Sequence, residues 1–237
     1  MDDLRTAALV AATNAWWAGR ISPDEVVTAV GEGRTIELPS AAPLLLGLSR
    51  LRESGATALL LALPRPGEPA NLHGDPDTIS GAILAGSVAV AVGESPVALV
   101  PTATGWQVRS GEVPAWGDTA GARRDLVSAV VAASDEITDL QLGRDRPGIT
   151  GAVDCGLLAM APLVRLLDPR AGDLALRAAR VLLILEIARA DRSAALTARE
   201  MQSESRILGL TSELESAARA ALAAAVNDGA RALVSGR

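Results

Sequence analysis

The fold class is decided by residues 87–109, SVAVAVGESPVALVPTATGWQVR. Three short apolar runs follow one another here, and two turns rich in Gly, Pro, Ser and Thr separate them. Short runs bounded by turn-forming residues are typical of β-strands, and the short connections predict an antiparallel meander. We therefore expect strands over residues 87–92, 97–101 and 106–110.

The residues before the meander predict one more strand and several helices. Residues 57–63 form a continuous apolar run that ends at a proline, which indicates a buried strand. The best-marked helix start is Ser22, because Glu25 completes an S-x-x-E capping box and a proline follows the serine. Helices are expected over residues 3–17, 22–31 and 40–54.

Helical spacing of apolar residues returns at Asp118 and continues almost to the C-terminus. A helix is expected over residues 119–141, and the Gly- and Pro-rich stretch 143–151 is the best domain boundary. We expect an α/β part over residues 1–142 and a helical part over 143–237, with helices over residues 156–167, 173–190, 197–208 and 212–233. The fold class is α+β: N-terminal helices with a small, mainly antiparallel sheet, followed by a C-terminal helical subdomain.

Four residues set the ends of the C-terminal helices in this prediction. Asp173 is expected to cap the helix that follows it, and Thr197 and Ser212 each begin a capping box. Gly209 lies between the last two helices and separates them. The apolar spacing there is heptad-like, but the helices are short, which favours packing in a bundle over a long coiled coil.

The composition excludes several classes of function. The chain contains no Lys, so the P-loop ammonium and the lysine Schiff base of pyridoxal phosphate enzymes are both missing. A net charge of −6 disfavours nucleic-acid binding. One Cys and one His cannot supply a Cys/His zinc site. We expect no cofactor and no metal, and we lean against an enzyme without deciding the question.

The strongest catalytic candidates lie in the loop NLHGDPD, residues 71–77. It contains the only histidine, His73, which Asp75 or Asp77 could orient as a general base. The same groups could also hold a divalent cation. The alternative is a structural turn in which Asp75 or Asp77 caps a helix that begins near Thr78.

Two tryptophans and one cysteine are the remaining candidates. Trp106 and Trp116 flank a polar hairpin and could line a binding surface, although a core without Phe and Tyr needs large side chains to fill it. Cys155 precedes an apolar helical stretch. A thiol at a helix start can act as a nucleophile, but a buried, inert thiol is the more common outcome.

Four segments carry a family resemblance: residues 177–192, AALTARE at 194–200, AARAAL at 217–222 and LPRPGEP at 63–69. They resemble an uncharacterised protein family of high-GC actinobacteria, in which the last segment has the form LPxPGDP. The resemblance implies an actinobacterial, cytoplasmic protein. It implies no activity.

The expected partner is another protein. Residues 1–5 lack the basic and apolar regions of a signal peptide, and the longest uncharged apolar stretch, 78–93, is too short to span a membrane. We therefore expect a cytoplasmic, non-catalytic accessory or protein-interaction protein that forms a homo-oligomer or binds a protein partner through its Ala-rich C-terminal helices. The alternative is a small-molecule- or metal-binding protein or a hydrolase that uses the His73 loop.

Overall fold

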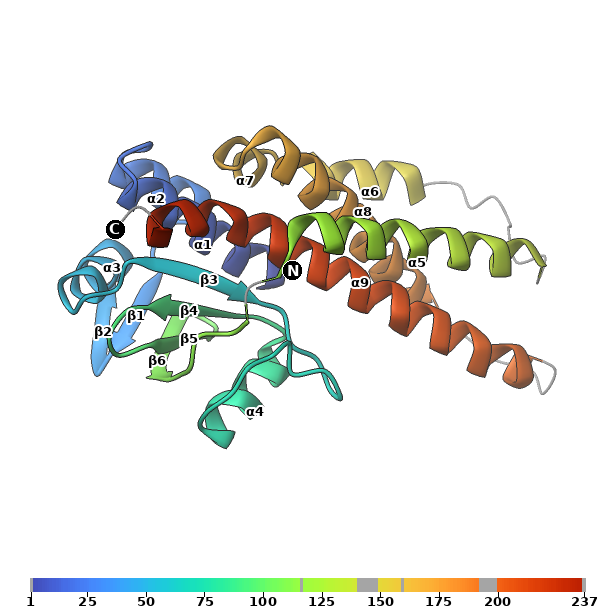
Figure 1. Cartoon of the computed structure of the whole chain (residues 1–237), viewed down its shortest axis with the longest axis horizontal. Coiled ribbons are helices and arrows are strands. Elements are labelled where there is room, and N and C mark those ends of the chain that lie inside the picture. The colour runs from blue at the N-terminus through green and yellow to red at the C-terminus, as the bar shows by residue number, and fades with distance from the viewer. Residues whose placement is uncertain (1, 116, 140–148, 159, 192–199, 236–237) are drawn as a thin grey trace.

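The computed structural model describes residues 2–115, 117–139, 149–158, 160–191 and 200–235. The chain has an α+β fold in which N-terminal helices and a mixed sheet are followed by a helical region (Figure 1). No helix in this part of the chain has both the length and the apolar character to cross a membrane.

The sheet has six strands in the order β2-β1-β6-β5-β4-β3. Its neighbouring strands are antiparallel, except for β1 and β6, which are parallel. The expected meander forms β4, β5 and β6, with β3 beside it as an outer strand. The strands are β1 (Thr35–Leu38), β2 (Ser40–Pro43), β3 (Ala58–Ala62), β4 (Val88–Val92), β5 (Val97–Pro101) and β6 (Gly105–Ser110).

The predicted helix over residues 40–54 begins too early. Residues 40–43 form β2, which pairs with β1, and α3 (Leu44–Glu53) begins only at Leu44. Pro43 explains the later start, because a proline disfavours helical backbone in the residue before it. The pairing of β1 with β6 joins segments about 70 residues apart, so no local pattern reveals it.

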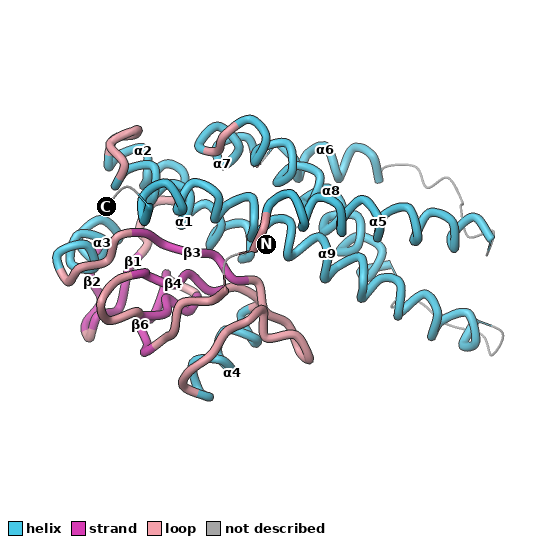
Figure 2. The backbone as a smooth tube through the Cα atoms, in the orientation of Figure 1, coloured by secondary structure: helices cyan, strands magenta, loops and turns pink. Residues whose placement is uncertain are grey.

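Helices cover both faces of the sheet. Helix α1 (Asp2–Trp17) packs on the face that carries Leu59, Leu61 and Leu99, whereas α4 (Pro76–Ala85) packs on the opposite face. Figure 2 shows the strands between α4 on one side and the long helices on the other. Helix α2 (Pro23–Val30) begins at the expected capping box and packs beside α1.

The helical region is built around one long helix. Helix α9 packs against α8, α5, α1 and β3, and its small residues Ala218, Ala221 and Ala225 are fully buried. The alanine face therefore lies inside the molecule. The helices of this region are α5 (Thr119–Asp139), α6 (Ile149–Leu158), α7 (Ala161–Leu166), α8 (Pro169–Asp191) and α9 (Glu200–Ser235).

The predicted break at Gly209 is wrong. Helix α9 runs without interruption through this glycine and through Ser212, so the S-x-x-E box at Ser212 does not begin a helix. Tertiary packing along α9 outweighs the cost of about 1 kcal/mol for a glycine inside a helix. Thr197 and the predicted boundary between residues 142 and 143 lie outside the described residues.

Two further helix limits differ from the prediction. The expected helix over residues 156–167 is two helices, because Pro162 lies in the first turn of α7 and begins a second one. Helix α8 begins at Pro169 and not at Asp173, because the carboxylate of Asp168 accepts a hydrogen bond from the backbone N–H of Arg170 at 2.8 Å. Asp173 instead lies within α8, where its carboxylate binds Arg123 and Arg177.

Two asparagine side chains form hydrogen bonds with the backbone of β3 at the outer edge of the sheet. Asn14 of α1 accepts a hydrogen bond from the N–H of Leu59 and donates one to its carbonyl, both at 2.8 Å. Asn227 of α9 does the same with Leu61, at 2.7 and 2.9 Å. The amides bind the strand as a neighbouring strand would, which protects an edge that would otherwise present unpaired backbone groups.

Candidate functional site

The His73 loop leads into α4, and Asp75 is the N-cap of that helix. Its carboxylate accepts hydrogen bonds from the hydroxyl of Thr78 at 2.9 Å and from the backbone N–H of Thr78 at 3.0 Å. These bonds favour the charged form and lower the pKa of Asp75. The carboxylate therefore has the capping role that was one of the two alternatives for this loop.

The other two residues of the loop do not join Asp75 in a concave site. His73 is exposed and borders a cavity of only about 10 Å³, which is about the smallest space that holds a water molecule. Asp77 is exposed, and its backbone carbonyl accepts a hydrogen bond from Arg109 at 3.2 Å. Among the described residues, no three His, Cys, Asp or Glu side chains could together hold a metal ion.

The structure places Trp106 in the core. Its side chain is 1% exposed, and its indole N–H donates to the hydroxyl of Thr6 at 3.5 Å. Thr6 in turn hydrogen-bonds to Ser87 at 3.0 Å, so the polar atom of the ring belongs to a buried network between α1 and the sheet. Trp106 fills space in the core, and Trp116 lies outside the described residues.

A charge cluster around one buried carboxylate joins the N-terminal part to the helical region. Glu215 of α9 binds Arg219 at 3.1 Å, Arg65 at 3.3 Å and also Arg189 of α8. Burial would raise the pKa of Glu215, but the hydrogen bonds and positive charges of Arg189 and Arg219 outweigh it and lower this pKa to about 2. We call these four residues the Glu215 cluster.

The loop that carries Arg65 is held to α9 by a second set of bonds. Arg65 binds Glu68 at 2.7 Å, and the hydroxyl of Ser216 donates to Glu68 at 2.7 Å. These contacts explain why the charged residues of the LPRPGEP segment face α9. Through these bonds the segment links the end of β3 to α9.

A cavity of about 160 Å³ lies beside this junction. Three of its polar side chains already have partners: Asn227 binds Leu61, Arg219 binds the carbonyl of Gly86 at 2.9 Å, and Glu68 is held as described. The cavity therefore offers few free polar groups to a ligand, and we interpret its surroundings as a structural junction.

A much larger groove lies on the outer side of the helical region. It has a volume of about 940 Å³ and is bounded by α6, α7 and α8. Gly156 lets α6 lie close to α8, because a Cβ atom at this position would be 2.8 Å from Leu183. We call this feature the α8 groove; its lining includes Leu157, Leu158, Val164, Arg165, Leu176, Arg177 and Arg180.

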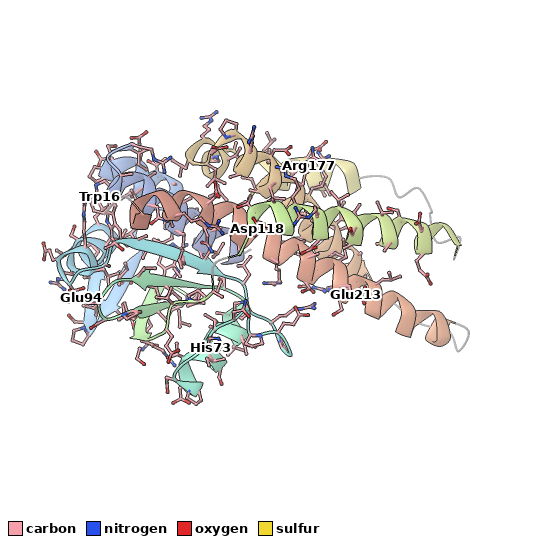
Figure 3. All side chains as sticks on the ribbon, viewed as in Figure 1. Trp16, His73, Glu94, Asp118, Arg177 and Glu213 are labelled. Carbon is pink, nitrogen blue, oxygen red and sulfur yellow. The ribbon has the colours of Figure 1, made fainter. Side chains whose placement is uncertain are left out.

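The rim of the α8 groove has an excess of positive charge. Asp173 binds Arg123 of α5 at 2.9 Å and Arg177 at 3.1 Å, and the hydrogen bonds from Arg123 and Arg177 lower its pKa. Arg165 and Arg180 are exposed, and no carboxylate in the described part of the chain pairs with either of them. The groove thus combines an apolar lining with the guanidinium groups of Arg165 and Arg180, whereas Arg177, which Figure 3 labels, is bonded to Asp173.

Three exposed valines lie on α5, whose residue Arg123 bonds to Asp173 of the groove lining. Val127, Val130 and Val131 are 49%, 37% and 54% exposed. Val127 and Val130 follow Arg123 by four and seven residues, so they lie on the side of α5 that faces α8, to which Arg123 is bonded. We call these three valines the α5 ridge.

Sequence reasoning used the apolar spacing over residues 119–141 only to predict a helix, so it did not separate the buried residues of α5 from the exposed ones. Leu126 is buried, whereas Val127 and Val131 point outward. The missed signal was the width of the apolar stripe. Apolar residues at 126, 127, 130 and 131 cover more of the helix circumference than one packing contact buries.

Comparison with known proteins identifies the family of both halves of the chain. A model described as Rv1486c-like protein, N-terminal domain, matches residues 6–116, and one described as Rv1486c-like protein, C-terminal domain, matches residues 120–223. No curated protein and no solved structure matches the chain.

Proposed function

We propose that this chain, which belongs to the Rv1486c-like protein family, is a non-catalytic protein-interaction protein whose docking surface combines the α8 groove and the α5 ridge. One observation carries the proposal. Of the seven large hydrophobic residues that are exposed in the described part of the chain, five lie on α5, α6 and α8. Contiguous apolar surface on a protein is typical of an interaction site.

The charges of the groove support the same function. An apolar centre with an arginine rim is the composition that protein interfaces favour, because Arg contributes both hydrogen bonds and apolar contact. Leu158 is 73% exposed at the end of α6, beside this rim.

We also propose that the protein acts in the actinobacterial cytoplasm and does not bind nucleic acid. The support is the sequence resemblance, the single cysteine and the net charge of −6. A ligand site at the His73 loop stays a prediction, and no contact in the structure favours it over the docking function.

Site-specific photo-crosslinking, carried out inside cells that naturally produce the protein, tests the docking function. A photoreactive residue is placed at position 131 or 158 and, as the control, at position 84, because Leu84 is 92% exposed on the distant helix α4. We expect discrete adducts from positions 131 and 158 and none from position 84. Equal labelling at all three positions, or no adduct at any, contradicts the proposal.

A further inference from the structure

We propose that the cavity of about 160 Å³ beside α9 binds a small molecule whose primary carboxamide pairs with the backbone of Leu63. The carbonyl of the ligand accepts from the N–H of Leu63, and its NH₂ group donates to the carbonyl of Leu63. The ligand thereby repeats what two asparagine side chains do at the same edge of β3. This cavity and the α8 groove share no described lining residue, so the inference is independent of the docking function.

The backbone of β3 faces the outer edge of the sheet at every second residue. The N–H and carbonyl groups of Leu59 and of Leu61 do so, because each pair bonds to an asparagine side chain there. Leu63 is next in this series, and its side chain packs in the same core cluster as those of Leu59 and Leu61. Pro64 also favours extended backbone at the residue before it. The alternation therefore continues, and the N–H and carbonyl of Leu63 face the outer edge too.

This third pair of backbone groups has no partner among the described residues. No hydrogen bond joins the N–H or the carbonyl of Leu63 to a group in that part of the chain, although the residue is only 4% exposed. Buried backbone groups in proteins are almost always paired, either with other protein groups or with bound molecules. An open pair at a buried edge therefore indicates a bound group that the chain itself does not supply.

Helix α9 explains why Leu63 is left without an amide. The chain directions of β3 and α9 are opposite here, since Leu61 bonds to Asn227, whereas the segment after β3 bonds to residues nearer the start of α9. Two strand residues span about 6.6 Å and four helix residues about 6 Å, so position 223 lies opposite Leu63. Alanine occupies this position, and Ala223 lines the cavity. The cavity is therefore the space that a third asparagine side chain would fill.

The rest of the cavity suits a compact apolar body. Residues 61–63 all line it, so it reaches the edge of the strand, and three of its polar side chains already have partners in the chain. Its small apolar lining residues include Pro114, Ala115, Ala220, Ala223 and Ala224. A space of about 150 Å³ is enough for a benzene molecule. A benzene ring that carries one carboxamide therefore matches both parts of the site.

Hydrogen exchange measured by nuclear magnetic resonance, with benzamide as the probe, tests the site. In the free protein the amide of Leu63 should exchange faster than that of Leu59, which Asn14 holds. Benzamide at about ten times its dissociation constant should slow the exchange of Leu63 about tenfold. The amide of Leu59 should change less and is the internal control.

Two probes of nearly the same shape test the carboxamide. Acetophenone has a methyl group in place of the NH₂ group, and benzoate has a second oxygen there, so neither can donate to the carbonyl of Leu63. Each should bind at least about tenfold more weakly than benzamide, because this carbonyl then loses water without gaining a donor.

The substitution Ala223→Asn tests the same site from the chain. Its amide should pair with Leu63, so the amide of Leu63 should exchange slowly without any probe, and benzamide should no longer bind. Ala223 is half-buried beside the cavity, which leaves room for the added atoms, and an unchanged thermal transition checks the fold. Ala132→Asn is the matched control at an exposed position of α5 and should leave exchange and binding unchanged.

Four results overturn the inference. The first is slow exchange of the Leu63 amide in the free protein, which would show that another group already pairs with it. The others are an amide of Leu63 that does not respond to millimolar benzamide, equal affinity for acetophenone or benzoate, and benzamide binding that persists in folded Ala223→Asn. Crosslinking from positions 131 and 158 tests the docking function separately.

Discussion

The Glu215 cluster and the α8 groove each contain three arginines. In the cluster all three bind a carboxylate of the chain, whereas in the groove only one of the three does. In the Glu215 cluster, Arg65, Arg189 and Arg219 converge on one buried carboxylate. In the groove, Arg177 is bonded to Asp173, while Arg165 and Arg180 have no carboxylate partner in the described part of the chain. Charges that are paired within the chain indicate a structural role. Charges without such a pair, beside exposed apolar side chains, indicate a surface for a partner.

The two regions also differ in what a substitution should change. Residues of the inner junction join β3, the 65–68 loop and α8 to α9, so their loss should lower the free energy of unfolding. Residues of the outer face have few intramolecular contacts to lose, so their loss should alter association and leave stability almost unchanged. The predictions below test this division.

The largest expected effect comes from Glu215→Ala. The substitution leaves three arginines facing one another around an empty position, and breaking a buried ion pair from one side costs about 3–5 kcal/mol. We expect the free energy of unfolding, measured in urea, to fall by about 4 kcal/mol. Glu213→Ala is the matched control on the exposed side of the same helix and should change it by less than about 0.5 kcal/mol. Similar effects of the two substitutions would contradict a structural role for the cluster.

Acid should remove the contribution of Glu215 to stability. Its pKa is lowered from 4.5 to about 2 in the folded chain, so its contribution is present above pH 4.5 and is lost as the pH falls towards 2. The shift corresponds to about 3 kcal/mol. Urea unfolding at pH 6 and at pH 2.5 should show that the difference between wild type and Glu215→Gln narrows in acid. A difference that stays constant over this range would be incompatible with the ion pairs described here.

A somewhat smaller effect is expected from Asn227→Leu. The leucine has nearly the same volume, but the N–H and carbonyl of Leu61 lose their partners, which costs about 2 kcal/mol. Hydrogen exchange provides an internal control. The amide of Leu61 should exchange faster, and that of Leu59, which Asn14 holds, should change less. Equal acceleration of the two amides would show that the asparagine does not act locally on the edge of β3.

The smallest effect on stability is expected from Val131→Lys. Its side chain is 54% exposed, so we expect the free energy of unfolding of the monomer to change by less than about 0.5 kcal/mol. Urea unfolding of dilute protein measures this value without a contribution from association. A loss comparable with that of Asn227→Leu would place Val131 in the core and remove the contrast between the two regions.

Local signals in the sequence were enough for much of the fold. Ser22 and Asp75 cap the helices that begin beside them, because capping depends on residues only three positions apart. The meander follows from short runs and turns in the same way. The pairing of β1 with β6 and the continuity of α9 through Gly209 depend on tertiary contacts, which a local pattern does not contain.

The functional surface was harder to predict than the fold. Asn14 lies on an apolar stripe of α1, and a polar residue in such a place signals a buried hydrogen bond, although not which strand it binds. Val131 belongs to an apolar set that predicts burial equally well on sequence alone. Only the position of α9 beneath α5 determines that Leu126 is buried and Val131 is not.

Crosslinking from the outer face tests the account most directly. A photoreactive residue at position 131 on α5 or at position 158 on α6 probes the surface assigned to a partner, and position 84 on α4, where Leu84 is 92% exposed, is the control. We expect discrete adducts from positions 131 and 158 and none from position 84. Equal labelling at all three positions, or no adduct at any, would contradict a docking function for the α5 ridge and the α8 groove.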